Sequence, residues 1–302
     1  MNNKRRLFST LLCVAALTAG LFVSGCGSDK AGGIGSVVSS VVDGGSDEKA
    51  AAKLNTLIDA TNNFNGDNAT WGQNYADSLA KLKGGFQEGA IGRQPHYDTL
   101  KDALEKSKKE GSTFKEVDTE RDNVLNILNE LVPTFKDLKA YDDSKAYMND
   151  GGAKGKELAA KYVAQVEKFD AAYAKFNETL NKVNAEQSKK QIEKLKKDGK
   201  KGYAAAMEST LRLTTLVENV EKAPKNADKQ AVEKELNEIQ TLLKSINNDR
   251  GEVLVNSYNS VVGSVRQVLT DANENNLNDM IENFNNYIES YNNTTPDQFD
   301  SK

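Results

Sequence analysis

Apolar residues recur every three or four positions through most of the chain, which is the spacing of one face of an α-helix. The pattern is strongest in the middle of the chain, where apolar positions alternate in steps of four and three. They are Tyr162, Val166, Phe169, Tyr173, Phe176, Leu180 and Val183. This heptad spacing predicts one long helix over about residues 155–197, which packs against antiparallel helices or forms a coiled coil.

Weaker helical periodicity on both sides of this segment predicts further helices, and glycine, proline or asparagine clusters predict the breaks between them. No segment shows the alternation of apolar and polar residues that marks a strand. The expected fold class is therefore all-α: an elongated helical bundle with one or two long helices and coiled-coil-like packing. The expected breaks are a turn over 62–67, a loop over 84–95, a kink or stop at Pro133, and interruptions at 149–152 and Pro224. Residues 198–199 either break the long helix or only weaken it.

The N-terminal segment has the composition of an export signal. Three basic residues at positions 4–6 precede the 17-residue apolar stretch Leu7–Val23, and the small residues Ser24 and Gly25 precede Cys26. This arrangement resembles the lipobox of bacterial lipoproteins, which implies cleavage before Cys26 and attachment of lipid to the Cys26 thiol. A permanent anchor helix is the alternative, but 17 residues lie at the short limit for spanning a bilayer, roughly 17–25 residues.

This interpretation divides the chain into four parts. Residues 1–25 are the signal peptide, and residues 26–48 are the lipidated cysteine followed by a flexible linker rich in glycine and serine. Such a linker has an r.m.s. reach of roughly 25 Å, which would hold the folded part away from the lipid surface. Residues 49–292 form the expected helical domain, and residues 293–302 form an expected disordered tail.

Charge and cysteine content narrow the function classes. The formal net charge of −4 becomes −7 without the basic residues at positions 4–6. A mildly acidic chain does not suggest nucleic-acid binding. Removal of the signal also removes Cys13, so Cys26 is the one remaining cysteine. We therefore expect no disulfide and no cysteine-based nucleophile or metal site.

Four short segments suggest chemistry, and each has a simpler explanation. His96 is the sole histidine, too few for a multi-histidine zinc site. Residues 271–282 place oxygen donors at an EF-hand spacing, but Leu277 and Ile281 already follow a helical register, which favours a helix start capped by Asp271 or Asn273.

The other two segments are weaker. Residues 151–157 lack the first glycine and the Ser or Thr of a phosphate-binding loop. Asp142 and Asp143 are neighbours, and neighbours on a helix point about 100° apart. We expect no catalytic, cofactor-binding or metal-binding residue, and therefore no enzyme.

A basic run follows the long heptad segment. Lys189, Lys190, Lys194, Lys196, Lys197, Lys200 and Lys201 lie within 13 residues. Such a run could contact anionic lipid or an anionic wall polymer. A solvated face on a long helix is the other explanation.

Several residues along the chain resemble those of one known family. They are Tyr141-Asp142-Asp143, Tyr147, Gly155-Lys156-x-Leu158, the Phe169…Phe176…Leu180 helix and the segment Phe284–Tyr291. With this set the chain is similar to the YiiG-like bacterial lipoproteins, which carry a domain of unknown function, over roughly Lys49–Tyr291. The resemblance implies a helical extracytoplasmic lipoprotein and brings no catalytic residues.

Two functions remain open from the sequence. The first is an interaction or scaffold module of the cell envelope, held on the membrane by lipid on Cys26 and presenting a surface to an envelope protein. It would lie on the outer face of the cytoplasmic membrane, or on the outer membrane in a cell with two membranes. The alternative is a lipoprotein that captures a small molecule, peptide or metal between helices.

Overall fold

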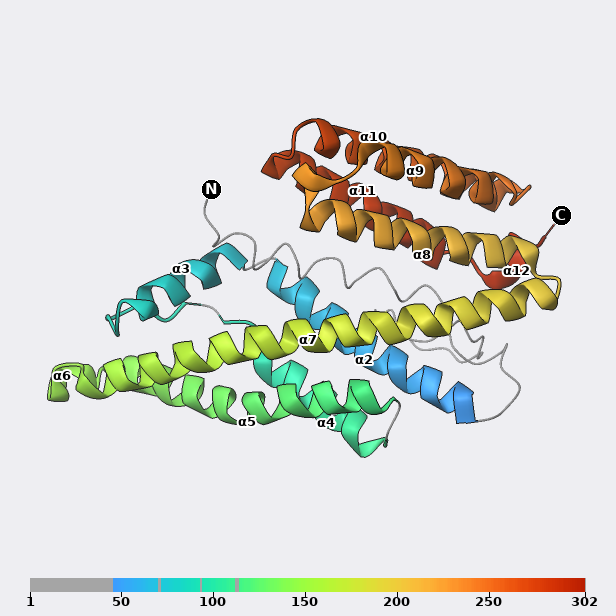
Figure 1. Cartoon of the computed structure of the whole chain (residues 1–302). Helices are drawn as coiled ribbons and strands as arrows, with labels where there is room; N and C mark the ends of the chain where they lie inside the picture. The colour runs from blue at the N-terminus through green and yellow to red at the C-terminus, as the bar shows by residue number, and fades with distance from the viewer. Residues whose placement is uncertain (1–45, 70–71, 93, 112–113, 302) are drawn as a thin grey trace. The chain divides into compact units, whose positions relative to one another are not determined.

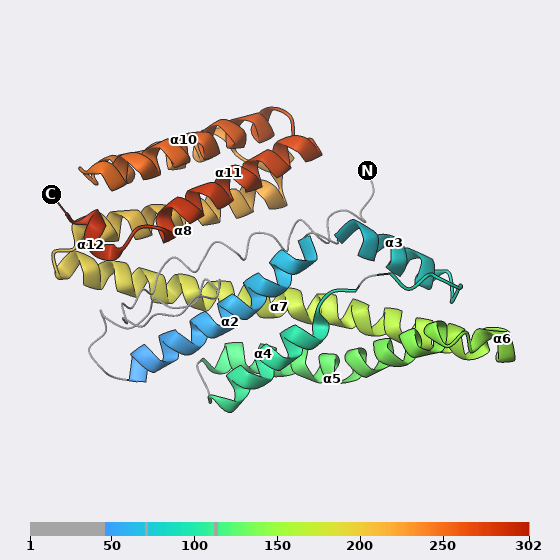
Figure 2. The same cartoon turned by 180° about the vertical axis from the view of Figure 1, so that it is seen from behind.

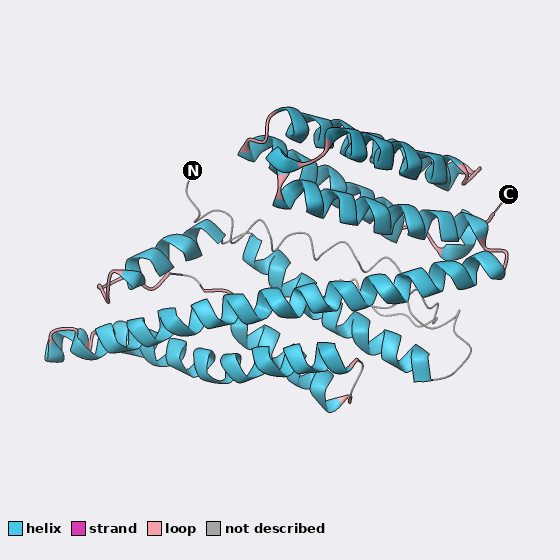
Figure 3. Ribbon diagram, viewed as in Figure 1, coloured by secondary structure: helices cyan, strands magenta, loops and turns pink. Residues whose placement is uncertain are grey.

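The computed structural model of the chain describes residues 46–69, 72–92, 94–111 and 114–301. These residues form helices joined by short loops, and no strand occurs among them (Figure 1, Figure 3). The all-α prediction is confirmed. Cys26 and the predicted linker up to residue 45 lie outside the described residues.

The helix boundaries follow the sequence periodicity closely. In chain order the elements are α2 (Ser46–Ala69), α3 (Gly72–Lys83), α4 (Tyr97–Lys109), α5 (Lys115–Asp143), α6 (Tyr147–Asp150), α7 (Ala153–Lys197), α8 (Lys201–Lys222), the 3-10 turn η2 (Pro224–Asn226), α9 (Lys229–Lys244), α10 (Asp249–Thr270), α11 (Glu274–Asn292) and α12 (Pro296–Phe299). The predicted long helix is α7, whose 45 residues extend about 68 Å at 1.5 Å per residue.

The chain divides into two compact units, and the boundary falls inside α7 between Val183 and Asn184. Unit 1 covers Lys53–Val183, and the described residues of unit 2 are 46–52 and those from Asn184 onward. The single helical domain expected over 49–292 does not anticipate this division. Each unit has its own buried core.

The core of unit 1 is built on aromatic side chains. Every position of the predicted heptad seam is buried. Phe169 stacks on Tyr173 with ring centroids 5.2 Å apart, and Phe64 of α2 meets Tyr173 edge-on at 5.3 Å. Tyr97 of α4 meets Phe169 edge-on at 5.0 Å. Helices far apart in sequence are therefore joined by the apolar face of α7.

The core of unit 2 lies between α8, α9, α10 and α11, which pack side by side (Figure 1, Figure 2). Buried Ala204, Ala205 and Ala206 lie on α8. Two buried tyrosines satisfy their hydroxyl groups internally, because Tyr258 donates to a backbone carbonyl of α9 and Tyr287 lies 3.1 Å from the Thr210 hydroxyl. Buried polar groups that find such partners avoid a large desolvation cost.

One predicted interruption is wrong, and a second does not end its helix. The expected turn over 62–67 belongs to α2, which continues to Ala69. Phe64 and Asn65 are buried there, and the Tyr173 hydroxyl donates to the Asn65 side-chain oxygen at 3.0 Å. Helix α5 continues through Pro133, so of the predicted kink or stop the stop does not occur. Pro133 is exposed, which leaves the missing hydrogen bond near solvent.

The predicted disordered tail is also corrected by the structure. Residues 296–299 form α12, which begins with a capping box between Thr295 and Gln298. Phe299 is buried and stacks on the rings of Tyr203 and Tyr291. An aromatic side chain placed in a core offsets the entropy lost when a short terminal segment becomes ordered.

Candidate functional site

The basic run lies on the solvent side of the last turns of α7, within unit 2. Ser188, Ile192 and Leu195 follow one another at helical spacing and are buried, so they fix which side of α7 faces the core. Lys189, Lys190 and Lys197 are exposed. We call Lys189, Lys190, Lys194 and Lys197 the lysine face. Its lysines therefore gather on one surface because the apolar residues between them occupy the other.

Acidic neighbours neutralise other lysines of the run. Lys196 pairs with Glu208 of α8 at 2.9 Å and with Glu193 at 3.5 Å, and these contacts raise the pKa of Lys196. Lys200 pairs with Asp297 at 3.2 Å. In contrast, Lys189, Lys190 and Lys197 form no ion pair with any described residue.

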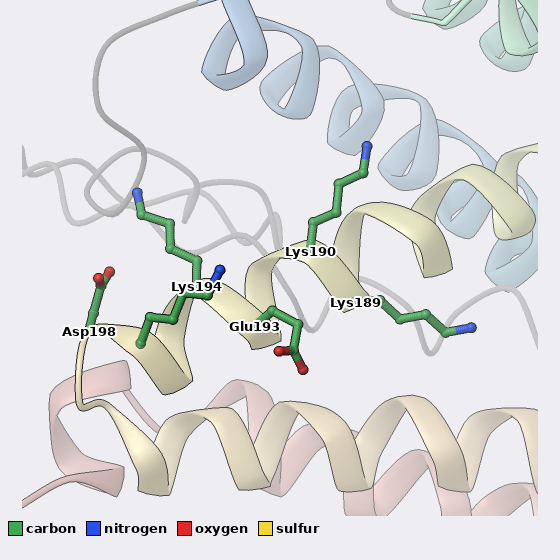
Figure 4. Close-up of a pocket in the computed structure, with 6 residues that line it drawn as sticks. Lys189, Lys190, Glu193, Lys194 and Asp198 are labelled. Carbon is green, nitrogen blue, oxygen red and sulfur yellow. The ribbon is translucent and has the colours of Figure 1, made fainter.

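A shallow depression of about 480 Å³ lies along the lysine face and is open to solvent. Figure 4 shows the amino groups of Lys190 and Lys194 on the same side of α7, whereas the carboxylate of Glu193 points to the opposite side. The ammonium groups of Lys190 and Lys194 thus point away from this carboxylate, although Glu193 lines the depression together with the lysines. The residues that line the depression are Lys189, Lys190, Glu193, Lys194, Lys197 and Asp198.

The charge of this segment contrasts with the rest of unit 2. Residues 184–201 contain seven lysines and three acidic residues, a net charge of +4. Residues 202–302 contain nine basic and sixteen acidic residues, a net charge of −7. The sequence analysis identified the lysine run, but only the structure separates Lys196 and Lys200, which form ion pairs, from Lys189, Lys190 and Lys197, which form none with a described residue.

Unit 1 contains a second candidate, a buried polar cluster that the sequence analysis missed. The hydroxyls of Tyr75 and Tyr97 lie 2.8 Å apart, and the Tyr162 hydroxyl donates to the side-chain oxygen of Gln94. Burial raises the pKa of all three tyrosines. Burial also raises the pKa of the nearby Asp170 carboxyl to about 6, against the opposing effect of Lys83.

The tyrosines of this cluster come from three separate helices, so no local motif marks it. The one signal in the sequence is Tyr162, a residue with a polar hydroxyl at a position of the heptad seam. The hydroxyl groups of Tyr75, Tyr97 and Tyr162 all bond within the protein. The arrangement is that of a satisfied polar core.

A third group of residues surrounds the hairpin between α5 and α7. Phe86 lies edge-on to Tyr141 with centroids 5.2 Å apart, and 5.8 Å from the ring of Tyr147. A Cβ atom added to Gly155 would come within 2.6 Å of the rings of both Phe86 and Tyr141. Tyr141, Tyr147 and Gly155 are among the residues on which the YiiG-like resemblance is based, and here they form one packed cluster.

Comparison with known proteins identifies a family. The family described as "Protein of unknown function (DUF3829)" matches residues 48–293, which is most of the chain. The chain belongs to the DUF3829 family. No curated protein and no solved structure matches it. The DUF3829 match covers nearly all the described residues of both units.

The remaining candidate segments of this DUF3829 protein have structural roles. Asp150 accepts hydrogen bonds from the Tyr141 hydroxyl at 2.5 Å and from the backbone N–H of Gly152 at 2.9 Å, so the glycine-rich segment is the entry to α7. Asn273 caps α11 by accepting from a backbone N–H at 2.9 Å, as one of the two predicted caps. Helix α11 therefore occupies most of the segment with EF-hand-like spacing.

The last two candidate residues from the sequence are His96 and Asp143. His96 lies at the N-terminus of α4 and is half-buried, and Asp143 pairs with Lys139 on its own helix at 2.9 Å. Across the described ranges, three or more His, Cys, Asp or Glu side chains nowhere gather in a way that could hold a metal ion. Within the same ranges no helix has the length and apolarity needed to cross a bilayer.

Proposed function

We propose that this DUF3829 protein is a lipid-anchored interaction module of the cell envelope. The anchor is the Cys26 thiol, which is supported by the lipobox-like residues that precede it and by the resemblance of the chain to YiiG-like lipoproteins. The folded part begins after the linker and works outside the cytoplasm. Its role is to bind an envelope component through its surface.

One observation carries this proposal: the lysines of the lysine face line an open surface, whereas the interior of unit 1 is filled by side chains that contact one another. The described cavity lies on the surface of α7 and is open, and its walls are mainly lysines. Inside unit 1 the aromatic rings and tyrosine hydroxyls contact one another. A small-molecule site usually encloses its ligand in a concave, largely apolar pocket. The geometry therefore supports surface recognition over capture of a ligand between helices.

Mass spectrometry of the protein purified from membranes of a bacterial host tests the anchor. We expect the mature N-terminus to be Cys26, with a diacylglycerol on the thiol and incorporation of an alkyne-labelled fatty acid. The matched variant Cys26→Ser should carry no label and leave the membrane fraction or retain its signal peptide. An unmodified N-terminus at another residue would refute the proposal.

A second experiment identifies the component that is bound. A photo-crosslinking amino acid at Lys190 should give adducts on intact cells, and the same group at exposed Lys225 of η2 serves as the control position. If both positions gave the same adducts in the same amounts, the lysine face would not be a binding surface for an envelope component.

A further inference from the structure

We propose that the lysine face binds anionic phospholipid headgroups of the membrane that holds the Cys26 lipid. This inference rests on the proposed function and names the partner of the surface described there. It assigns unit 2 a preferred orientation, with the last turns of α7 towards the bilayer.

The first argument is charge complementarity. Lys189, Lys190 and Lys197 are exposed and make no ion pair among the described residues, so their ammonium groups can interact with an external anion. The segment 184–201 contains lysine and no arginine. Lysine acts as a hydrated point charge, whereas arginine gives fixed bidentate geometry, so this composition suits a fluid layer of phosphates more than one rigid ligand.

The second argument is the repulsion from the rest of the unit. Residues 202–302 carry a net charge of −7, which an anionic surface repels. The attraction is therefore restricted to orientations that bring the lysine face to the bilayer. Screening limits such interactions to about 8–10 Å at physiological ionic strength, so the two opposite regions act separately.

The third argument selects a membrane over a wall polymer as the occupant. Only 19 residues separate Cys26 from the start of α2 at Ser46. A chain of that length spans at most about 65 Å, even when fully extended. Anchoring through Cys26 thus makes contact with the bilayer intramolecular and raises the effective concentration of headgroups at the lysine face.

Lysine footprinting on the acylated full-length mature protein tests the proposal. The protein is reconstituted in vesicles of phosphatidylcholine alone or with about 30% phosphatidylglycerol, treated briefly with an amine-reactive acetylating reagent, and analysed by mass spectrometry. Each lysine near an anionic surface gains roughly a fivefold factor in binding. We expect Lys189, Lys190 and Lys197 to be labelled at least fivefold more slowly on the anionic vesicles. The protection should disappear at about 0.5 M salt, where the Debye length is only a few ångströms.

A pair of charge-matched variants separates the lysine face from net charge. The test variant is Lys189→Glu/Lys190→Glu/Lys197→Glu, and the control is Lys225→Glu/Lys229→Glu/Lys244→Glu, which alters the same number of charges at exposed positions of η2 and α9. Protection of the neighbouring Lys201 is the readout. It should be lost in the test variant and kept in the control, and circular dichroism verifies that both variants fold.

The outcomes are distinct. Equal labelling of acylated protein on neutral and anionic vesicles would overturn the lipid contact and leave the proposed anchor intact. Protection by soluble poly(glycerol phosphate) but not by anionic vesicles would overturn it in favour of a wall polymer. Intact mass of the same sample reports acylation, and a chain without acyl groups would overturn both the proposed function and this inference.

Discussion

Replacing Phe299 with alanine tests whether the C-terminal residues belong to the core of unit 2. Phe299 is 2% exposed, and its ring stacks on Tyr203 at 5.9 Å and on Tyr291 at 5.8 Å. The Asn248 side chain also donates to the carbonyls of Gln298 and Phe299, each at 3.1 Å. Loss of the ring would therefore open a cavity and weaken the contacts that hold α12 against α8.

The expected cost follows from these contacts. Replacing a buried phenylalanine with alanine costs about 3–5 kcal/mol. Because Phe299 belongs to a helix of four residues, the backbone around it can relax, and we expect the lower limit, about 3 kcal/mol. With a urea m-value of about 2 kcal/mol/M, the unfolding midpoint of unit 2 should fall by roughly 1.5 M.

Urea titration followed by circular dichroism measures this change, and hydrogen exchange with mass spectrometry locates it. Faster exchange should appear in peptides of α8 and α11, whereas peptides of unit 1 should keep their protection. The control is Asp297→Ala on the same segment, whose side chain is 89% exposed and forms one exposed ion pair, so its cost should stay below about 1 kcal/mol. A cost below about 1 kcal/mol for Phe299→Ala would mean that the tail is not part of the core.

Two further predictions concern buried positions of unit 1. Gly155→Ala should lower the free energy of unfolding by about 2 kcal/mol, because the new Cβ would lie 2.6 Å from two rings. At exposed Gly263 an added Cβ atom would meet no group beyond its own stretch of helix within 4 Å, so Gly263→Ala should instead raise the free energy of unfolding by up to about 1 kcal/mol. Urea titration measures both changes, and similar effects at the two sites would contradict the packing around Gly155. Burial raises the pKa of Asp170 and Asp59 to about 6, so the folded state binds more protons than the unfolded state between about pH 4 and 6. Stability should therefore rise as the pH falls from 7 to 5, and Asp170→Asn should be more stable than the parent at pH 7.5 and lose this advantage near pH 4; an advantage independent of pH would refute the assignment.

The sequence by itself determined the helices, because helix formation depends on local periodicity and on residues that interrupt it. The heptad seam specified α7, and the break after it falls where Gly199 adopts a positive φ of 79° that other residues rarely adopt. The cap of α11 could also be predicted, because Asn273 accepts its hydrogen bond from a backbone N–H only three residues away. The lysine run could also be identified from the sequence, because its seven lysines lie close together along the chain.

Tertiary structure decided the features that depend on partners distant in sequence. The asparagine- and glycine-containing segment at 62–67 remains helical because Phe64 and Asn65 are buried against α7. The tail is ordered because Phe299 has two tyrosine rings to stack on, and Glu208 determines that Lys196 is paired. Local propensity amounts to tenths of a kcal/mol per residue, whereas burial of one large apolar side chain contributes about 1.5–3 kcal/mol, so packing outweighs it wherever the two conflict.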